Sequence, residues 1–358
     1  MAGETPAVET TPDLEEQPAT WSARLSSSII YFILPVLIIV FTIISRQSFF
    51  NPNNFQNIAI FASTLLLLVV GSTFVIITAG IDLSVGSVLV FSSVVAAQAM
   101  VTLSGSAEEV RAREYPNQMF GISAGIVLGV LSGLAWGLLN GVLITKLRIP
   151  PFIVTLGTLG MSLGLALILS GGVNVPFVPP TVQSEIGSRA LFVVPIGTGQ
   201  FRFTVPVAVA TVVIVIAALA LHKTRFGRYT YAIGSNADAA RRAGINVDAH
   251  LIKVYGLSGM LAGVAGVLDV ALFSTASVGS HASDNLSAIS AVVIGGTSLF
   301  GGIGSIGGSV VGAFIPAILR NGFVIQGIQP FWQQVAIGAI LILAVYLDQR
   351  RRQAEERR

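Results

Sequence analysis

Ten apolar runs, separated by short polar segments, make up most of this chain of 358 residues. A helix that crosses a lipid bilayer needs about 20 predominantly apolar residues. Most of the runs reach or approach that length, and residues 57–79 contain no charged side chain at all. The sequence therefore predicts an all-α fold, a polytopic membrane helix bundle with about ten transmembrane segments. The predicted segments are residues 28–45, 57–79, 84–101, 121–145, 151–170, 203–221, 251–273, 287–300, 306–323 and 331–347.

The composition supports a membrane protein over a soluble one. Only 10% of the residues are charged, whereas soluble domains carry about 25%. The 38 glycines suit closely packed membrane helices and permit broken ones. Residues 287–300 are short for a full span, so this segment is a candidate for a re-entrant or broken helix, covered by protein or lining a water-filled cavity. Cysteine is absent, which excludes disulfides and thiolate metal sites.

Basic residues are distributed unevenly among the loops. With the N-terminus in the cytoplasm, 14 of the 20 Lys and Arg residues fall on the cytoplasmic side and five on the outer side, with Arg320 near an outer helix end. Cytoplasmic loops are rich in Lys and Arg, so the bias predicts that both termini are cytoplasmic. These charges adjoin apolar runs and mark topology, so we expect no nucleic-acid partner. We expect a disordered tail at 1–27, a transmembrane domain at 28–347 and a basic cytoplasmic tail at 348–358.

The stretch TAGIDLSVGS, residues 78–87, places a carboxylate between two apolar runs. A carboxylate at the bilayer centre costs about 2.5–3.5 kcal/mol on insertion scales, so such a residue normally faces a cavity, a partner or the interface. Two interpretations are open, and they are compatible: Asp82 or Ser84 caps the following helix, and Asp82 belongs to a gate or translocation path. Hydroxyl and amide side chains in other runs suit a path for a neutral polyhydroxylated solute, although most of them can equally bond neighbouring helices. The candidate residues for the gate or path are Gly80, Asp82, Ser84, Gly86, Asn140, Thr155 and Thr158.

The largest predicted cytoplasmic loop, residues 223–250, contains the segment NADAARRAGINV. A capping residue at Asn236 or Asp238, helix-forming alanines and a stop at Gly244 predict a short exposed helix within residues 236–247. Such a helix can dock into a groove on a partner protein, or lie on anionic lipid through its arginines. The candidate residues for docking are Asn236, Asp238, Ala239, Ala240, Arg241, Arg242 and Gly244.

Several kinds of site are missing from the sequence. It has no phosphate-binding loop of the form GxxxxGK[ST], no pair of carboxylates within the predicted spans and no clustered His and Glu for acid–base or metal chemistry. Asp269, near the outer end of its span, is expected to be solvated or paired. His281 and Asp284 fall in an outer loop, and two such residues do not make a metal site. We expect neither enzymatic activity nor a cofactor bound by this chain.

Four motifs in order carry a resemblance to a known family: GIDLSVGS (80–87), FGRYTYAIGSNADAARRAGINV (226–247), SAISAVVIGGTSLFGGIGSIGGSVVGAF (287–314) and QQVAIGAILILAVYLDQRRR (333–352). Together they resemble the permease subunits of bacterial ATP-binding-cassette importers for monosaccharides, among them the ribose permeases. The resemblance covers about residues 41–352. The tail and the outer loop at 102–120 have no match in the family pattern.

The resemblance implies a permease subunit in the bacterial inner membrane that forms the path for a monosaccharide, a ribose-like pentose or a hexose. The implied partners are a cassette ATPase that uses the ATP, an extracytoplasmic sugar-binding protein, a second permease copy and membrane lipid. The exposed loop helix would then be the ATPase-coupling segment. An alternative is a secondary transporter or facilitator for sugar or another small polar solute, which would need no ATPase and, if coupled, buried ionisable groups for ion or proton coupling.

Overall fold

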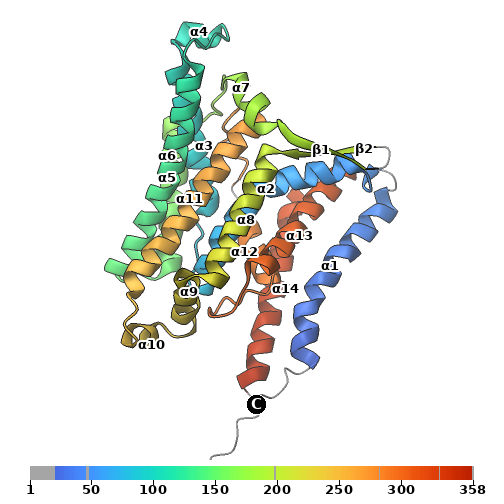
Figure 1. Ribbon diagram of the computed structural model, residues 1–358, viewed down its shortest axis with the longest axis vertical. Coiled ribbons are helices and arrows are strands. Elements are labelled where there is room, and N and C mark those ends of the chain that lie inside the picture. Colours follow the sequence, from blue (N-terminus) through green and yellow to red (C-terminus); the bar gives the residue numbers. More distant parts are fainter. Residues whose placement is uncertain (1–20, 46–47, 197–198, 282, 330, 357–358) are drawn as a thin grey trace, which may run out of the picture.

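The computed structural model describes residues 21–45, 48–196, 199–281, 283–329 and 331–356. The prediction of an all-α membrane bundle is confirmed, with the addition of one small β-hairpin (Figure 1). By length and composition, seven of the described helices can cross a membrane. They are α2 (Pro52–Ile77), α3 (Val85–Ser104), α5 (Gln118–Lys146), α6 (Pro151–Ser170), α8 (Val205–Lys223), α11 (Val247–Phe273) and α13 (Ile306–Ile325).

Three further predicted spans correspond to shorter apolar stretches. These lie in α1 (Trp21–Ser45), α12 (Asp284–Ile294) and α14 (Phe331–Glu356). At 1.5 Å per residue, the 11 residues of α12 rise only about 16 Å, roughly half of a hydrocarbon core. As a single helix, the eighth segment is therefore too short to cross the membrane, as its length in the sequence suggests, while the total of ten crossings stays a prediction.

The ends of the chain differ from the predicted tails in their limits. Helix α1 begins at Trp21, inside the tail predicted at 1–27, and the rest of that tail lies outside the described residues. Helix α14 continues through the polar sequence as far as Glu356. Its last turns contain Arg, Gln, Ala and Glu, which are strong helix formers, so the change from apolar to charged residues does not end the helix.

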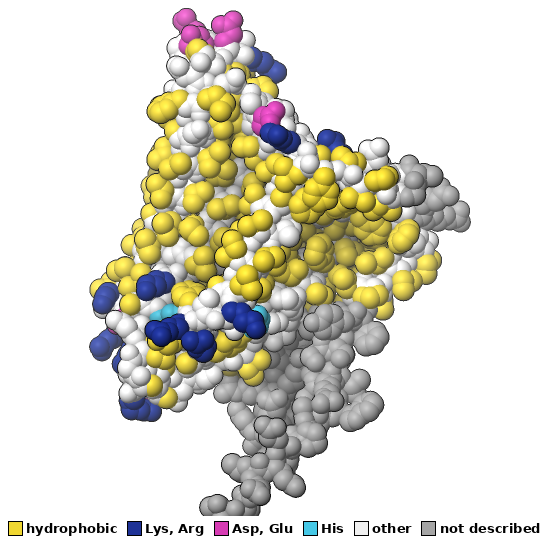
Figure 2. All heavy atoms as spheres, viewed as in Figure 1, with side chains coloured by type: hydrophobic (Ala, Val, Ile, Leu, Met, Phe, Trp, Pro, Cys, Tyr) yellow, Lys and Arg dark blue, Asp and Glu magenta, His cyan; other side chains and the backbone are white. Residues whose placement is uncertain are grey.

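Short elements connect the long helices. At one end of the bundle lie α4 (Ala107–Arg111), α7 (Pro180–Val182), the π-helical turn η2 (Gln183–Gly187) and the antiparallel strands β1 (Ala190–Ile196) and β2 (Gly199–Thr204). At the other end lie α9 (Arg225–Ser235) and α10 (Ala237–Arg242) (Figure 1). Lys and Arg side chains gather around α9 and α10, whereas most of the acidic side chains in view lie towards the opposite end (Figure 2). We call the end with α9 and α10 the basic end and the end with β1 and β2 the hairpin end.

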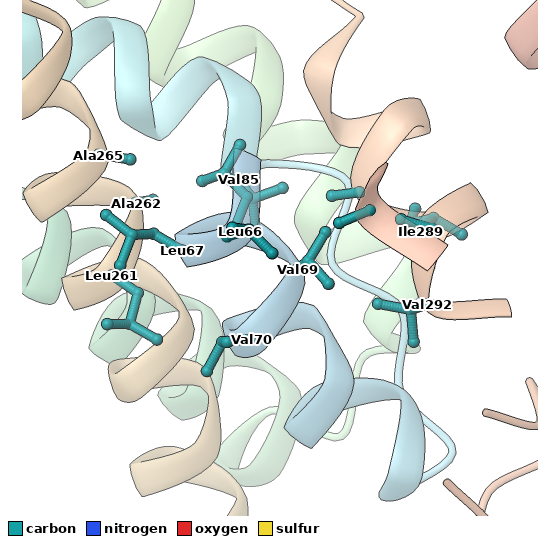
Figure 3. Close-up of a cluster of buried hydrophobic side chains, with 14 of the residues drawn as sticks. Leu66, Leu67, Val69, Val70, Val85, Leu261, Ala262, Ala265, Ile289 and Val292 are labelled. Carbon is teal, nitrogen blue, oxygen red and sulfur yellow. The ribbon is translucent and has the colours of Figure 1, made fainter. Parts of the chain in front are cut away.

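The core forms around α2, which packs against α11 on one side and α12 on the other (Figure 3). Leu66, Leu67 and Val70 of α2 are almost completely buried, and Leu261 of α11 and Ile289 of α12 belong to the same cluster. Most of the other long helices expose apolar side chains along their outer faces, which form the broad apolar flank in Figure 2. A largely buried central helix and outer helices with exposed apolar faces are typical of a bundle solvated by lipid.

Helices α5 and α11 approach each other along a row of glycines. A Cβ atom at Gly133 would lie 2.4 Å from the carbonyl oxygen of Gly259, and one at Gly137 would lie 2.3 Å from that of Tyr255. Only glycine fits at such a distance. The row therefore fixes α5 directly against α11, and with it the polar side chains that these two helices carry.

Candidate functional site

The GIDLS motif forms the non-helical link between α2 and α3. Helix α2 ends at Ile77, Ala79 adopts a positive φ of 59°, and α3 begins at Val85. A Cβ atom at Gly80 would lie 2.5 Å from the hydroxyl oxygen of Tyr255, and one at Gly86 would lie 2.9 Å from the carbonyl oxygen of His281. The two predicted glycines thus let this link pack tightly between α11 and the chain that precedes α12.

Asp82 is buried at the centre of the link, with 3% of its surface exposed. Its Oδ1 accepts hydrogen bonds from the backbone N–H of Ser84 at 3.0 Å and from the Ser84 hydroxyl at 2.6 Å. Its Oδ2 accepts one from the hydroxyl of Ser258 on α11 at 3.1 Å. Among the described residues no Lys, Arg or His forms an ion pair with Asp82. The carboxyl group is therefore held by neutral donors alone.

The hydrogen bonds continue from Asp82 into α5 and α6. Asn140 of α5 donates through Nδ2 to the Ser84 hydroxyl at 2.9 Å, and Thr158 of α6 donates to Oδ1 of Asn140 at 2.7 Å. Thr155 donates to the carbonyl oxygen of Ile81 at 3.2 Å. These polar side chains are all almost completely buried. The structure thus brings all seven residues predicted for the gate or path into and around one link.

This polar cluster joins helices, and its geometry differs from an ordinary cap. Ser84 is the N-cap of α3, but its side chain makes no hydrogen bond to the first turn of the helix. In an ordinary cap, the side chain accepts the backbone N–H of the second or third helical residue. Asp82 instead accepts the backbone N–H of Ser84, the N-cap residue itself. Bonds between membrane helices contribute about 0.6 kcal/mol each. Both a structural and a gating role are compatible with the contacts, and the gate stays a prediction.

The predicted docking helix is α10, which lies at the basic end. Asn236 is its N-cap, accepting the N–H of Ala239 through Oδ1 at 2.8 Å. The helix α10 ends at Arg242, and Gly244 follows with a positive φ of 84°. This conformation favours glycine and turns the chain into α11, which already includes Val247. Gly244 follows the end of the helix, in agreement with the predicted stop at this residue.

Contacts on its inner side hold α10 in place. Ala240 is buried against Ile233 of α9 and Val247 of α11, and the guanidinium of Arg241 pairs with Asp248 at 3.0 Å. Asp238, Ala239 and Arg242 are exposed. Helix α9 was not predicted from the sequence. Its residue Tyr231 donates a hydrogen bond to the carbonyl oxygen of Gly304 at 2.7 Å, so the helical pair is connected directly to the loop between α12 and α13.

That loop in turn contacts the link around Asp82. The backbone N–H of Gly302 donates to the carbonyl oxygen of Ile77, the last residue of α2, at 2.9 Å. The loop 295–305 is non-helical, and α9 and the end of α2 contact it through Tyr231 and Ile77. Helix α9 and the C-terminal end of α2 are therefore connected through this loop.

Asp269, His281 and Asp284 form a buried ion triad at the α11–α12 connection. The three residues stand out individually in the sequence, but their interaction with one another was not predicted. His281 donates through Nε2 to Asp269 at 2.9 Å and through Nδ1 to Asp284 at 2.7 Å. Burial lowers the pKa of His281, but the hydrogen bonds and charges of the two carboxylates outweigh it and raise the pKa from 6.5 to about 10. The expected pairing of Asp269 is thus observed. Both ring nitrogens are occupied, so His281 has no lone pair for a metal.

Comparisons with known proteins place the chain among transport permeases. A model of the family described as branched-chain amino acid transport system / permease component matches residues 54–345. The chain is 36% identical to the ribose import permease protein of Escherichia coli (strain K12) over 322 residues, which are 89% of this chain and 93% of the relative. It is 37% identical to the ribose import permease protein of Bacillus subtilis (strain 168) over 316 residues, 88% of this chain and 90% of the relative.

A relative named for another sugar matches over a similar range. The chain is 33% identical to the D-allose transport system permease protein of Escherichia coli (strain K12) over 318 residues, 89% of this chain and 90% of the relative. None of the solved structures matches the chain significantly. The resemblance to importer permeases that the four motifs predict is confirmed. The chain is a multi-pass membrane protein and belongs to the family of branched-chain amino acid transport system permease components.

Proposed function

We propose that this chain is the permease subunit of an ATP-binding-cassette importer in the bacterial cytoplasmic membrane and forms the path for a monosaccharide. The relatives named for ribose and D-allose import support a sugar as the solute. An extracytoplasmic binding protein delivers the sugar, and a separate ATPase supplies the energy. The chain itself binds no cofactor in this proposal.

The observation that carries the proposal is the exposed helical pair at the basic end. Helix α10 is anchored on its inner side by Ala240 and presents an exposed outer surface with Asp238 and Arg242. A partner that binds α10 can act on α2 through Tyr231, Gly304 and the Gly302–Ile77 hydrogen bond. In the proposal the ATPase binds α9 and α10 on the cytoplasmic side, and both chain termini lie on that side.

The polar cluster around Asp82 suits a neutral solute. Apart from the carboxyl group, its side chains are hydroxyls and one amide, which donate and accept hydrogen bonds without binding an ion tightly. In the proposal Gly80, Asp82, Ser84, Gly86, Asn140, Thr155 and Thr158 act as the gate between the helices, and α2 moves them. A second permease copy completes the path, and lipid covers the remaining apolar flank.

Co-purification with an ATPase tests the central part of the proposal, that a separate ATPase drives the chain. The tagged chain, purified in mild detergent, should retain the cassette ATPase of its transport system, and the sugar-loaded binding protein should stimulate ATP hydrolysis by the complex in liposomes. A chain that binds no ATPase and transports sugar on an ion gradient would instead be a secondary transporter.

A further inference from the structure

A polar cavity of about 160 Å³ lies between α2, α12, α13 and α14. This is far more than the ~10–15 Å³ that one water molecule needs. Arg320 lies 14 positions after Ile306 on α13, about 20 Å further along the axis at 1.5 Å per residue. The cavity therefore lies towards the hairpin end, away from α9 and α10. Its polar lining consists of Thr64, Ser280, Ser283, Asp284, Ser287, Arg320, Gln333 and Gln334.

Arg320 is a cation in an otherwise apolar helix. Among the described residues it has no acidic partner within ion-pair distance, and its guanidinium carbon lies 5.8 Å from the centre of the Phe61 ring. Ionisable residues in membrane segments are costly and usually serve substrate or ion pathways. The planar guanidinium donates hydrogen bonds in fixed directions, so it can orient a ligand with several oxygen atoms.

Asp284 is held by the buried triad. Both nitrogens of the His281 ring face carboxylate oxygens, at 2.7 Å from Asp284 and 2.9 Å from Asp269, so both carry protons and the ring is a cation. The charged residues that line the cavity are Asp284 and Arg320, and their charges sum to zero. The cavity thus offers fixed charges that can bond hydroxyl groups, but no excess of either sign to hold an ion.

The remaining lining groups point to the same ligand chemistry. The amides of Gln333 and Gln334 and the hydroxyls of Thr64 and Ser287 both donate and accept hydrogen bonds. Phe61 adds one aromatic ring at the edge of the cavity. A sugar ring has hydroxyls around its rim and a face of C–H groups that can pack on an aromatic ring.

We propose that this cavity binds one neutral sugar ring as it enters the membrane domain, with Asp284, Arg320, Gln333 and Gln334 bonding its hydroxyls and Phe61 packing against its face. The inference rests on the proposed import of a monosaccharide and adds the entry site. The cavity lies apart from the Asp82 cluster, on the other side of α12. A sugar would therefore occupy it before the gate opens.

Thiol protection can test this site directly, because the chain contains no cysteine. Ser283 lines the cavity, and Ser184 is an exposed serine of η2 at the same end. The full-length variants Ser283→Cys and Ser184→Cys are purified and alkylated with N-ethylmaleimide while D-ribose, D-allose, gluconate or glucosamine is titrated. At least one neutral sugar should slow alkylation of Ser283→Cys by a factor of 1 + [sugar]/Kd, roughly tenfold near ninefold excess over Kd. Ser184→Cys should react unchanged.

A second substitution distinguishes protection by a bound sugar from a change in the reactivity of the introduced thiol. Added to Ser283→Cys, Gln333→Leu should abolish the protection, whereas Gln329→Leu, an exposed glutamine outside the cavity, should preserve it. The proposal is overturned if no sugar protects, if gluconate or glucosamine protects as well as the sugars, or if Gln333→Leu leaves protection intact. ATP-driven uptake by the same Ser283→Cys complex is measured in parallel. Uptake without protection refutes the entry site alone, whereas protection without uptake refutes the importer.

Discussion

The side chain of Asp82 connects the start of α3 with α11 and, through Ser84, with α5. Its two oxygen atoms accept hydrogen bonds from Ser84 and from Ser258, and Ser84 in turn binds Asn140. Each donor is neutral and buried. The acceptors of this side chain contribute to stability, and its charge contributes to transport only if Asp82 acts in gating, so the two roles can be separated by substitution.

Replacing Asp82 by Asn should preserve the fold and impair transport. The amide oxygen can still accept from Ser84, and the amide nitrogen can donate to the Ser258 hydroxyl, so we expect a loss of stability below about 1 kcal/mol. If the charge acts in gating, sugar uptake should fall roughly tenfold, equivalent to about 1.4 kcal/mol on the barrier. Expression, melting temperature and uptake are the measurements. Parallel losses of expression and uptake would assign Asp82 a structural role only.

Asp82→Ala provides the matched comparison. It leaves the donors of Ser84 and Ser258 without an acceptor in a buried site, at about 1–3 kcal/mol for each unpaired group. The melting temperature should therefore fall well below that of Asp82→Asn. Equal melting temperatures for the two variants would show that the hydrogen bonds contribute little.

Gly137→Ala should destabilise the bundle although it adds only one methyl group. That methyl would lie 2.3 Å from the Tyr255 carbonyl oxygen, so α5 and α11 must separate, at a typical overpacking cost of about 1–3 kcal/mol. Gly157→Ala on α6 meets nothing within 4 Å and should be neutral or stabilising, because alanine favours helix by about 1 kcal/mol. Thermal unfolding followed by size-exclusion chromatography compares them. Similar melting temperatures would contradict the close contact.

At the scale of elements, the exposed pair α9 and α10 depends on one backbone conformation. Gly244→Val introduces a β-branched residue at a φ of 84°, where L-residues other than glycine are strained, so the turn into α11 should be disrupted. Ala243→Val places the same side chain one residue earlier, at a φ of −78°. Co-purification of the ATPase should fall strongly for Gly244→Val and little for Ala243→Val. Full recovery of ATPase with Gly244→Val would remove the coupling role from this turn.

The connection between α11 and α12 should give the protein a pH-dependent stability. The pKa of His281 is about 10 in the folded chain, against 6.5 for a free histidine. A raised pKa stabilises the folded state fully below about pH 6.5, and the contribution declines as the pH rises until it is lost above about 10. The difference in melting temperature between the natural chain and His281→Gln should thus shrink between pH 6.5 and 10. A difference that is constant or grows over this range would contradict a protonated His281.

Sequence patterns predicted the long elements well and the short ones poorly. Apolar runs located α2, α3, α5, α6, α8, α11 and α13 within a few residues, because lipid requires a continuous apolar helix whatever its neighbours. The strands β1 and β2 were missed since a single hairpin has little signal of its own in seven and six residues. Helix α9 was missed because its sequence, RFGRYTYAIGS, has two glycines and β-branched residues, and tertiary contacts such as Tyr231 with Gly304 stabilise it.

For the candidate site, the sequence showed which residues were candidates, but it did not show which of them lie next to one another in the fold. The carboxylate of Asp82 and the amide of Asn140 stand out in apolar runs, yet 58 positions separate them and only the packing of α5 brings them into one cluster. The triad of Asp269, His281 and Asp284 shows the same limit. Its members appear as isolated ionisable residues until the chain between α11 and α12 folds back.

At the scale of the whole molecule, the proposed coupling contacts and the proposed sugar cavity adjoin the same central helix. Helix α2 contacts the α12–α13 loop at its basic end and contributes Phe61 and Thr64 to the cavity nearer the hairpin end. Its core packing lies between α11 and α12 (Figure 3). A force applied to α9 and α10 can therefore alter the Asp82 link and the cavity together, which is what a permease driven by an external ATPase requires.

Uphill uptake into liposomes is the most direct test of this account. Vesicles containing the chain, with or without its cassette ATPase and binding protein, are supplied with labelled sugar under an ATP supply or under a proton or sodium gradient. We predict accumulation only with both partners and ATP, and none by the chain alone on either gradient. Accumulation by the chain alone, driven by an ion gradient without any nucleotide, would contradict the central claim that this permease takes its energy from a partner.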